Sequence, residues 1–408
     1  MQEPIKVLLL DDATDRAQTW AAHINQYPSC IASAPGKEDV RDLISILFKR
    51  RKVGRASGAK FWEIACDAID TADLLIIDYD LQNLDADGEW TTGSEVAYSA
   101  RLVSKAKTIV VINQRGANRF DLTLIKGAES RADFDVGSVQ LINPGLWQSN
   151  GFQGFRPWHW PNLLLEPARA TESIAFIKEH LDSPVLTSLG FCEDFDSGRA
   201  LRPEVWGKLC VELTTTFREL VAPAYEEHSL HLLFSDTAIF KDDDELTATI
   251  AAAVTRRWLE RWVLPNQDIL ADAAHLALRM PWILVNNEEE ASWRKLETLE
   301  ASDVLVPRIG DFKFAASCLF SRPVYWAESL DVSGELRPAN FDYSKIPDFV
   351  FREDVSNFGA PDSSRDFPSQ VISIENRRWI SDPDNEPQME GPQNIKAVVF
   401  EPQSLLLS

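Results

Sequence analysis

Three uninterrupted apolar runs of strand length constrain the fold of this chain more than any other feature. They are IKVLLL at 5–10, LLIID at 74–78 and KTIVVIN at 107–113. A strand that is apolar at every position is buried on both faces, as in a parallel sheet covered by helices. Because segments with helical spacing separate these runs, the first half predicts β–α–β crossovers and a doubly wound parallel α/β sheet.

The segments around these runs predict the helices of the sheet. In the first of them, Trp20, Ala21 and Ile24 share one face, and Asp12 or Thr14 is the expected N-cap. The second is expected to break at the polar stretch RRKVGRASG and then to resume. Helices are therefore predicted at 12–27, 37–49, 59–72, 93–105 and 171–181.

Two further strands are expected, and one of them has two candidates. CIASA at 30–34 predicts a short second strand. VQLIN at 139–143 and LLLEP at 163–167 both have the apolar content of a fifth strand, and they compete for that place.

Carboxylates stand at the carboxyl ends of two predicted strands. Asp11 and Asp12 follow the first run, and Asp78 ends the next. Ligands of doubly wound sheets bind at such strand ends, where the strand order reverses. Three acids converging there repel one another unless a cation lies between them, and carboxylate oxygens suit Mg²⁺ or Mn²⁺. The sequence predicts a divalent-cation site; the alternative is that these residues only cap a helix and a turn.

In this order, VLLLDD, IIDYDL and VVIN resemble the receiver domain of bacterial two-component response regulators, over about residues 5–181. The resemblance implies that Asp11 and Asp12 hold Mg²⁺ and that Asp78 accepts a phosphoryl group from a histidine kinase or another phosphodonor. It also implies that Asp80 stands where the family uses a backbone carbonyl as metal ligand. Gly93 matches the glycine that opens the third helix.

Two positions depart from the receiver pattern. Asn113 stands where receivers carry Ser or Thr at the end of strand four. The Lys-Pro pair that ends strand five in receivers is replaced by Asn143-Pro144 or by Glu166-Pro167. Asn113 can still donate a hydrogen bond to a phosphoryl oxygen, but none of these residues supplies the cationic charge of the lysine. The sequence therefore predicts a divergent receiver.

From about residue 198 the pattern changes, and the second half resembles no family. A helix is expected over 202–225 and a second over 242–264, which acids open and arginines close, as the helix dipole favours. Short strands are expected after 300, so the class is α+β. The composition of FCEDFDSGRALRP at 191–203 predicts a boundary between a receiver-like domain at 1–190 and an output or interaction domain at 198–408.

The leading interpretation is a signalling protein in which a receiver-like domain controls an atypical output domain that binds a protein partner. One alternative is a metal-dependent hydrolase or nuclease with its centre in the second half. Another is a scaffold whose receiver fold serves only for docking.

Asp78-Tyr79-Asp80 also resembles the Toprim nuclease and primase motif, but that fold requires Glu where this chain has Asp. The candidate residues of a second-half centre are His228 and His231 beside Glu226, Glu227 and Asp236, then Asp268, Asp272 and His275, and finally Asp311 and Lys313.

Composition limits the partners. The formal net charge of -22 disfavours broad nucleic-acid binding, and the one basic stretch, at 48–55, is expected to be a solvated loop or helix end. The five cysteines are scattered, which predicts a reducing cytoplasm. With no long apolar run and no export signal at the start, no membrane association is expected. The oligomeric state is left open.

Overall fold

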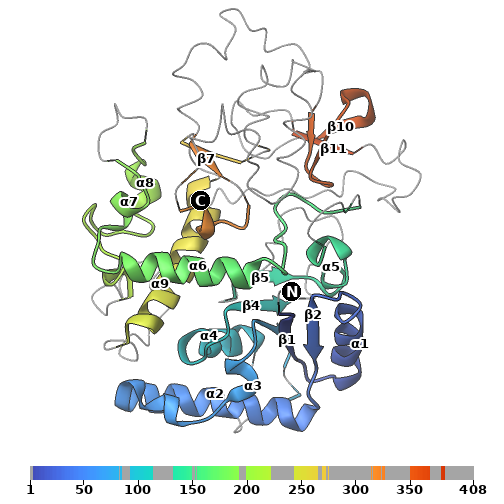
Figure 1. Cartoon of the computed structure of the whole chain (residues 1–408), viewed down its shortest axis with the longest axis vertical. Coiled ribbons are helices and arrows are strands. Elements are labelled where there is room, and N and C mark those ends of the chain that lie inside the picture. Colours follow the sequence, from blue (N-terminus) through green and yellow to red (C-terminus); the bar gives the residue numbers. More distant parts are fainter. Residues whose placement is uncertain are drawn as a thin grey trace, which may run out of the picture.

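The first half of the chain is organised around a five-stranded parallel sheet (Figure 1). The strand order is β2-β1-β3-β4-β5, with a reversal between β1 and β3. This order is that of a flavodoxin-like doubly wound sheet, so the predicted α/β class is confirmed for this part. The strands are β1 (Ile5–Leu10), β2 (Cys30–Ser33), β3 (Leu74–Asp78), β4 (Thr108–Ile112) and β5 (Phe134–Val136).

The computed structural model describes most of the first half and shorter pieces of the second. The described residues are 3–81, 83–84, 92–113, 132–148, 152, 154–192, 199–221, 243–264, 269–272, 274, 314, 316–322, 324–326, 350–367 and 378–381.

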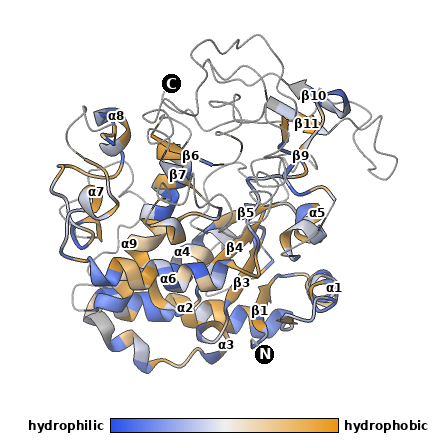
Figure 2. Cartoon of the chain, turned by 45° about the horizontal axis from the view of Figure 1, so that its top comes forward, coloured by the Kyte–Doolittle hydropathy of each residue, from blue (hydrophilic) through white to orange (hydrophobic). Residues whose placement is uncertain are grey.

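Helices cover both faces of the sheet, as its fully apolar strands require. One face carries α1 (Thr14–Ile24), α5 (Ser138–Leu141) and the 3₁₀ turn η2 (Pro144–Leu146). The other carries α2 (Lys37–Ser57), η1 (Gly58–Glu63), α3 (Asp67–Asp70), α4 (Gly93–Val103) and α6 (Glu166–Glu179). Figure 2 shows the central strands in the hydrophobic colour between these layers.

The predicted break in the second helix is wrong. Helix α2 runs without interruption through the basic stretch and ends at Ser57. Its Arg50 is 1% exposed and forms an ion pair of 2.7 Å with Asp70, and its Nε donates to the carbonyl of Ile64. Arg51 lies 4.6 Å from the ring of Tyr98. The basic stretch is therefore not a loop but lies in the last turns of α2, where Lys49, Lys52 and Arg55 are exposed and Arg50 is buried.

Both candidates for the fifth strand are also wrong. The fifth strand is β5, where Asp135 lies between Phe134 and Val136. The segment 139–143 falls mainly in α5 and the turn after it, and Glu166 opens α6. A strand of three residues with a central acid has no apolar run by which the sequence could reveal it.

The described pieces of the second half are helical near the sheet and stranded farther along the chain. The single helix predicted over 202–225 is wrong, because the described residues 202–221 contain two separate short turns of helix, at Pro203–Trp206 and Glu219–Val221. The helix predicted from 242 is confirmed as α9, with Asp243 as its N-cap. Before the predicted boundary lies one more short helix, α7 (Val185–Ser188). The described elements of the second half are α8 (Pro203–Trp206), η4 (Glu219–Val221), α9 (Asp244–Trp258), the π-helical turn η8 (Leu259–Val263), β6 (Leu270–Ala271), η14 (Ser317–Leu319), β7 (Tyr325–Trp326), β8 (Val350–Arg352), β9 (Asn357–Gly359), η15 (Pro361–Ser363), β10 (Ser364–Phe367) and β11 (Arg378–Ser381).

The described strands of the second half form two small sheets. Strands β6 and β7 pair antiparallel, and β8 to β11 form a four-stranded sheet in the order β10-β11-β8-β9. None of the described helices combines the length and the apolarity needed to cross a bilayer.

Helix α9 joins the two predicted domains, because it crosses and packs against α6 (Figure 1). Ile250, Val254 and Trp258 of α9 belong to the same hydrophobic cluster as Leu75 and Ile109 of the sheet. Within this contact, Arg256 donates to the fully buried Glu166 at 2.5 Å. The hydrophobic core thus continues across residue 198, and the division into two domains stays a prediction.

Candidate metal centre

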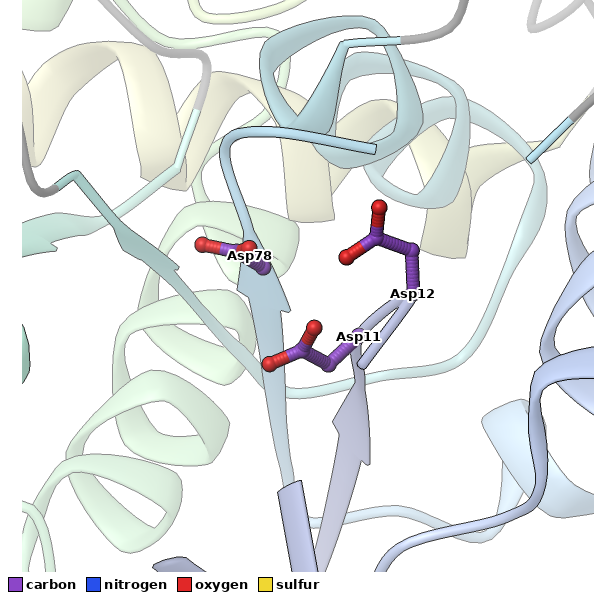
Figure 3. Close-up of side chains that lie close together, drawn as sticks. All are labelled: Asp11, Asp12 and Asp78. Atoms are coloured by element: carbon purple, nitrogen blue, oxygen red, sulfur yellow. The ribbon is translucent and has the colours of Figure 1, made fainter. Parts of the chain in front are cut away.

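Three carboxylates converge at the carboxyl edge of the sheet. Asp11 and Asp12 follow β1, Asp78 is the last residue of β3, and these strands are neighbours (Figure 3). One oxygen of each side chain lies within 4.8 Å of the others. Asp11 and Asp78 are each 1% exposed. The sequence prediction that these three acids meet is therefore confirmed, and their oxygens have the character that Mg²⁺ or Mn²⁺ prefers.

Asp78 has the most perturbed electrostatics of the three. Burial, followed by the charge of Asp11, raises the pKa of Asp78 to about 7, although the nearby Arg16 opposes this shift. Its Oδ1 atom is buried and has no hydrogen-bond partner among the residues that the structure describes. A buried carboxylate oxygen without a donor is costly unless a proton or a cation reaches it. Asp78 thus carries one buried oxygen that is not compensated by a donor among the described residues.

Arg16 of α1 enters this acidic cluster. Its Nε donates to Asp11 Oδ2 at 2.8 Å and its Nη2 to Asp11 Oδ1 at 2.7 Å, which is the bidentate geometry of strong arginine–carboxylate pairs. The same Nη2 donates to Asp78 Oδ2 and lies 3.5 Å from Asp12 Oδ1. The hydrogen bonds to Asp11 and the surrounding negative charges raise the pKa of Arg16, so it stays cationic.

The backbone around β1 explains how Asp11 and Asp12 are held. The N-cap of α1 is Ala13 without a side-chain hydrogen bond, so the prediction that Asp12 or Thr14 caps this helix is wrong. The amide of Ala13 instead donates to Asp11 Oδ1 at 2.7 Å. Asp12 Oδ2 accepts from the side chain of Asn83 at 2.6 Å. Asp11 therefore stabilises the turn before α1 as well as belonging to the acidic cluster.

Gly93 allows α4 to begin directly against the end of β3. A Cβ atom at this position would overlap the carbonyl oxygen of Asp78 and lie 2.7 Å from the Cα of Tyr79. The amide of Gly93 donates to the carbonyl of Tyr79 at 2.9 Å. The glycine expected to open the third helix is thus its first residue, and its lack of a side chain brings α4 up to the site.

The other predicted site residues lie at the same edge but outside the cluster. Asn113 follows β4 and is 5% exposed, and its backbone N–H donates to the carbonyl of Val136. Asp80 is exposed and forms an isolated bridge with Thr92. Among the described acidic groups, the cluster that can hold an ion contains Asp11, Asp12 and Asp78 but not Asp80.

Neither proposed replacement of the receiver lysine lies at the end of strand five. Asn143 is the N-cap of η2, where its side chain accepts from the amide of Gly145. Glu166 lies in α6, and its carboxylate pairs with Arg256. The residue that follows β5 is Gly137. The sequence alignment of this position was therefore wrong, and the cation near the carboxylates comes from α1.

Most residues considered for a centre in the second half lie outside the described part of the chain. These are His228, His231, Glu226, Glu227, Asp236, Asp268, His275, Asp311 and Lys313. Asp272 is described and is 1% exposed, with its carboxylate 3.3 Å from Arg322.

Sequence reasoning missed Arg16, although a signal for it was present. Arg16 lies four residues after Asp12, and Trp20 lies four residues after Arg16. Residues at this spacing share one face of a helix. The guanidinium is 5.4 Å from the ring of Trp20, so the pattern Asp-x-x-x-Arg-x-x-x-Trp would have placed a cation above the predicted site.

The chain matches no known protein family, no curated protein and no solved structure. The likeness to receiver domains therefore stands on the strand order and on the acidic cluster.

Proposed function

We propose that the chain is a cytoplasmic regulatory protein whose first half is a divergent receiver-like domain. In this proposal Asp11, Asp12 and Asp78 bind a divalent cation, Mg²⁺ or Mn²⁺. The observation that carries it is the cluster itself, in which one oxygen of each of the three carboxylates lies within 4.8 Å of the others and Asp11 and Asp78 are each 1% exposed. A bound cation would neutralise this cluster and attract the negative charge of a phosphoryl group.

In the same proposal Asp78 is the phosphoacceptor. Its Oδ1 is the oxygen that Arg16 leaves without a hydrogen bond, so this atom is the nucleophile. It forms a bond to the phosphorus of the donor, while the bond from phosphorus to the leaving oxygen breaks. Asn113, at the neighbouring strand end, is the proposed hydrogen-bond donor to the transferred group.

Metal binding is the first testable consequence. Calorimetric titration with Mn²⁺ should detect one site, and Asp11→Asn should abolish it, because this change removes a charged ligand from the buried cluster. Asp15→Asn is the matched control, since Asp15 is exposed in the first turn of α1. An isotherm that Asp11→Asn leaves unchanged would place the metal elsewhere.

Phosphoryl transfer is tested separately from metal binding. The purified chain is incubated with Mg²⁺ and acetyl phosphate, and its intact mass is measured. We expect the addition of one phosphoryl group in the wild type and none in Asp78→Asn. Metal binding without this mass change would limit the function to cation binding.

A second candidate function is a receiver-like scaffold that docks a partner without phosphorylation. The observation that favours it is Arg16, whose guanidinium already neutralises part of the acidic cluster. In this case an output assay should give equal activity for the wild type and Asp78→Asn. Loss of activity in Asp78→Asn, with folding and metal binding intact, would instead support the phosphoacceptor.

A further inference from the structure

The position of Arg16 coincides with the place where a cation would bind. Its Nη2 atom contacts carboxylate oxygens of both Asp11 and Asp78. A third carboxylate oxygen, from Asp12, is 3.5 Å away. The three acids that can hold an ion thus already surround one positively charged nitrogen.

A divalent ion and this nitrogen cannot occupy the cluster together. Mg²⁺ and Mn²⁺ bind carboxylate oxygens at about 2.0–2.3 Å, so an ion shared by the three acids lies between their oxygens. That is the volume which Nη2 fills while it contacts the same groups. Two cations at such a distance would also repel each other strongly, because the site is largely buried.

We propose that Arg16 is a tethered counter-ion that a divalent cation must displace, and therefore the residue that sets the metal affinity of this site. This inference rests on the proposed function. Without metal, Arg16 compensates the buried negative charge of the cluster. With metal, the ion takes over this role and the guanidinium leaves, so the site binds metal only above the concentration at which this exchange is favourable.

The side chain of Arg16 can move out of the cluster without a change in the fold. Its side chain is 35% exposed, although those of Asp11 and Asp78 are 1% exposed. It lies in the first turn of α1, where a change of side-chain rotamer moves the guanidinium and leaves the helix unchanged. The ring of Trp20, one turn along the same helix, is already within cation–π distance at 5.4 Å.

The experiment compares Mn²⁺ affinities of the full-length wild type, Arg16→Gln and Arg41→Gln by titration calorimetry. Arg41 is a half-exposed arginine on α2 that forms ion pairs with Glu38 and Asp42 of the same helix, so its substitution changes the net charge equally without touching the site. We expect Arg16→Gln to bind Mn²⁺ at least about tenfold more tightly, because the competing cation is gone. Arg41→Gln should stay within about twofold of the wild type.

Thermal unfolding gives an independent readout and guards against a folding defect. In EDTA, Arg16→Gln should melt below Arg41→Gln, because the three carboxylates of the cluster, two of them buried, have lost their counter-ion. Added Mg²⁺ should raise the melting temperature of Arg16→Gln more than that of the wild type. Arg16→Lys keeps the charge but loses the bidentate geometry, so its rise in melting temperature with Mg²⁺ should lie between those of the wild type and Arg16→Gln. It serves as the second variant if Arg16→Gln does not fold.

The outcomes separate this inference from the proposed function. Equal or weaker binding in Arg16→Gln, with binding in the wild type that depends on Asp11, overturns the counter-ion role but leaves the metal site standing. Binding only in Arg16→Gln supports the counter-ion role and removes metal binding from the function of the wild type. An absence of binding in all variants overturns both.

Discussion

At the residue scale, the acidic cluster is a local source of instability. It places three carboxylates and one guanidinium together at a buried edge of the sheet. The raised pKa of Asp78, about 7, means that the folded protein holds a proton there more tightly than an exposed aspartate does. Since such clusters are kept despite their cost mainly at functional sites, this cost agrees with a binding role.

The pKa of Asp78 predicts how stability changes with pH in the absence of metal. An unfolded aspartate titrates near 3.8, so between about pH 4 and pH 7 the folded state binds more protons than the unfolded state. The contribution of Asp78 to stability must therefore decrease as pH rises through this window. Above pH 7 its ionised form costs roughly 2–4 kcal/mol relative to acidic solution.

Asp78→Asn should remove this pH dependence. In EDTA at pH 8 we expect the variant to be more stable than the wild type by roughly 1–3 kcal/mol, with a smaller difference at pH 5. Urea unfolding at both pH values measures it, and Asp15→Asn, at an exposed position, is the control. A variant that is equally destabilised at both pH values would show that Asp78 is a structural acid.

The candidate site could be predicted from sequence only where it depends on strand ends. Parallel strands bring their carboxyl ends to one edge, so apolar runs that ended at Asp11 and Asp78 were enough to predict their convergence. The position of Arg16 also depends on the direction in which α1 leaves the sheet. The spacing of Arg16 from Asp12 and Trp20 indicates a shared helix face, but the contacts of its guanidinium with Asp11 and Asp78 also depend on how α1 packs on the sheet.

At the element scale, the same distinction between local and tertiary signals applies to the sheet and its helices. Strands β1, β3 and β4 are apolar at nearly every position and were predicted with their positions. The break expected in α2 was wrong because an arginine in a sequence indicates an exposed position. In the fold Arg50 is buried, where it donates to the carbonyl of Ile64 and to the carboxylate of Asp70. A charged residue on a buried helix face is tolerated only when such partners compensate its charge, and these partners come from distant parts of the chain.

Helix α4 is the element that most directly supports the site. It begins at Gly93, against the backbone of Asp78 and Tyr79, and its N-cap Thr92 accepts from the amide of Glu95. Any side chain at residue 93 forces the helix away from the end of β3. Because the contacting atoms are backbone atoms at the end of a central strand and of the residue after it, they cannot yield by a change of rotamer.

Gly93→Ala should therefore reduce both stability and metal affinity. We expect a loss of about 1–3 kcal/mol in the free energy of unfolding and weaker Mn²⁺ binding, because the Asp78 backbone moves. The control is Gly36→Ala, since a Cβ atom there meets its nearest neighbour at an ordinary 3.7 Å. Urea unfolding and Mn²⁺ calorimetry give the two readouts; equal behaviour of both variants would contradict the close packing at Gly93.

At the scale of the whole molecule, the contact between α6 and α9 determines whether the halves are independent. Arg256 of α9 is 9% exposed and pairs with Glu166, which is 0% exposed. Breaking a buried pair by removing one partner costs about 3–5 kcal/mol, because the other charge stays buried without compensation. Together with the shared hydrophobic cluster, this pair leads us to expect that neither half is stable alone.

Splitting the chain near the predicted boundary tests this expectation. Residues 1–198 with an affinity tag and residues 199–408 without one should copurify when they are expressed together, because α6 and α9 contribute to one core. Glu166→Arg in the first piece should abolish copurification by placing two buried arginines together, and Arg256→Glu in the second should partly restore it. If each piece instead folds alone and the two do not associate, the chain consists of two domains with independent cores, and any signal from Asp78 must pass through the linker rather than through α6 and α9.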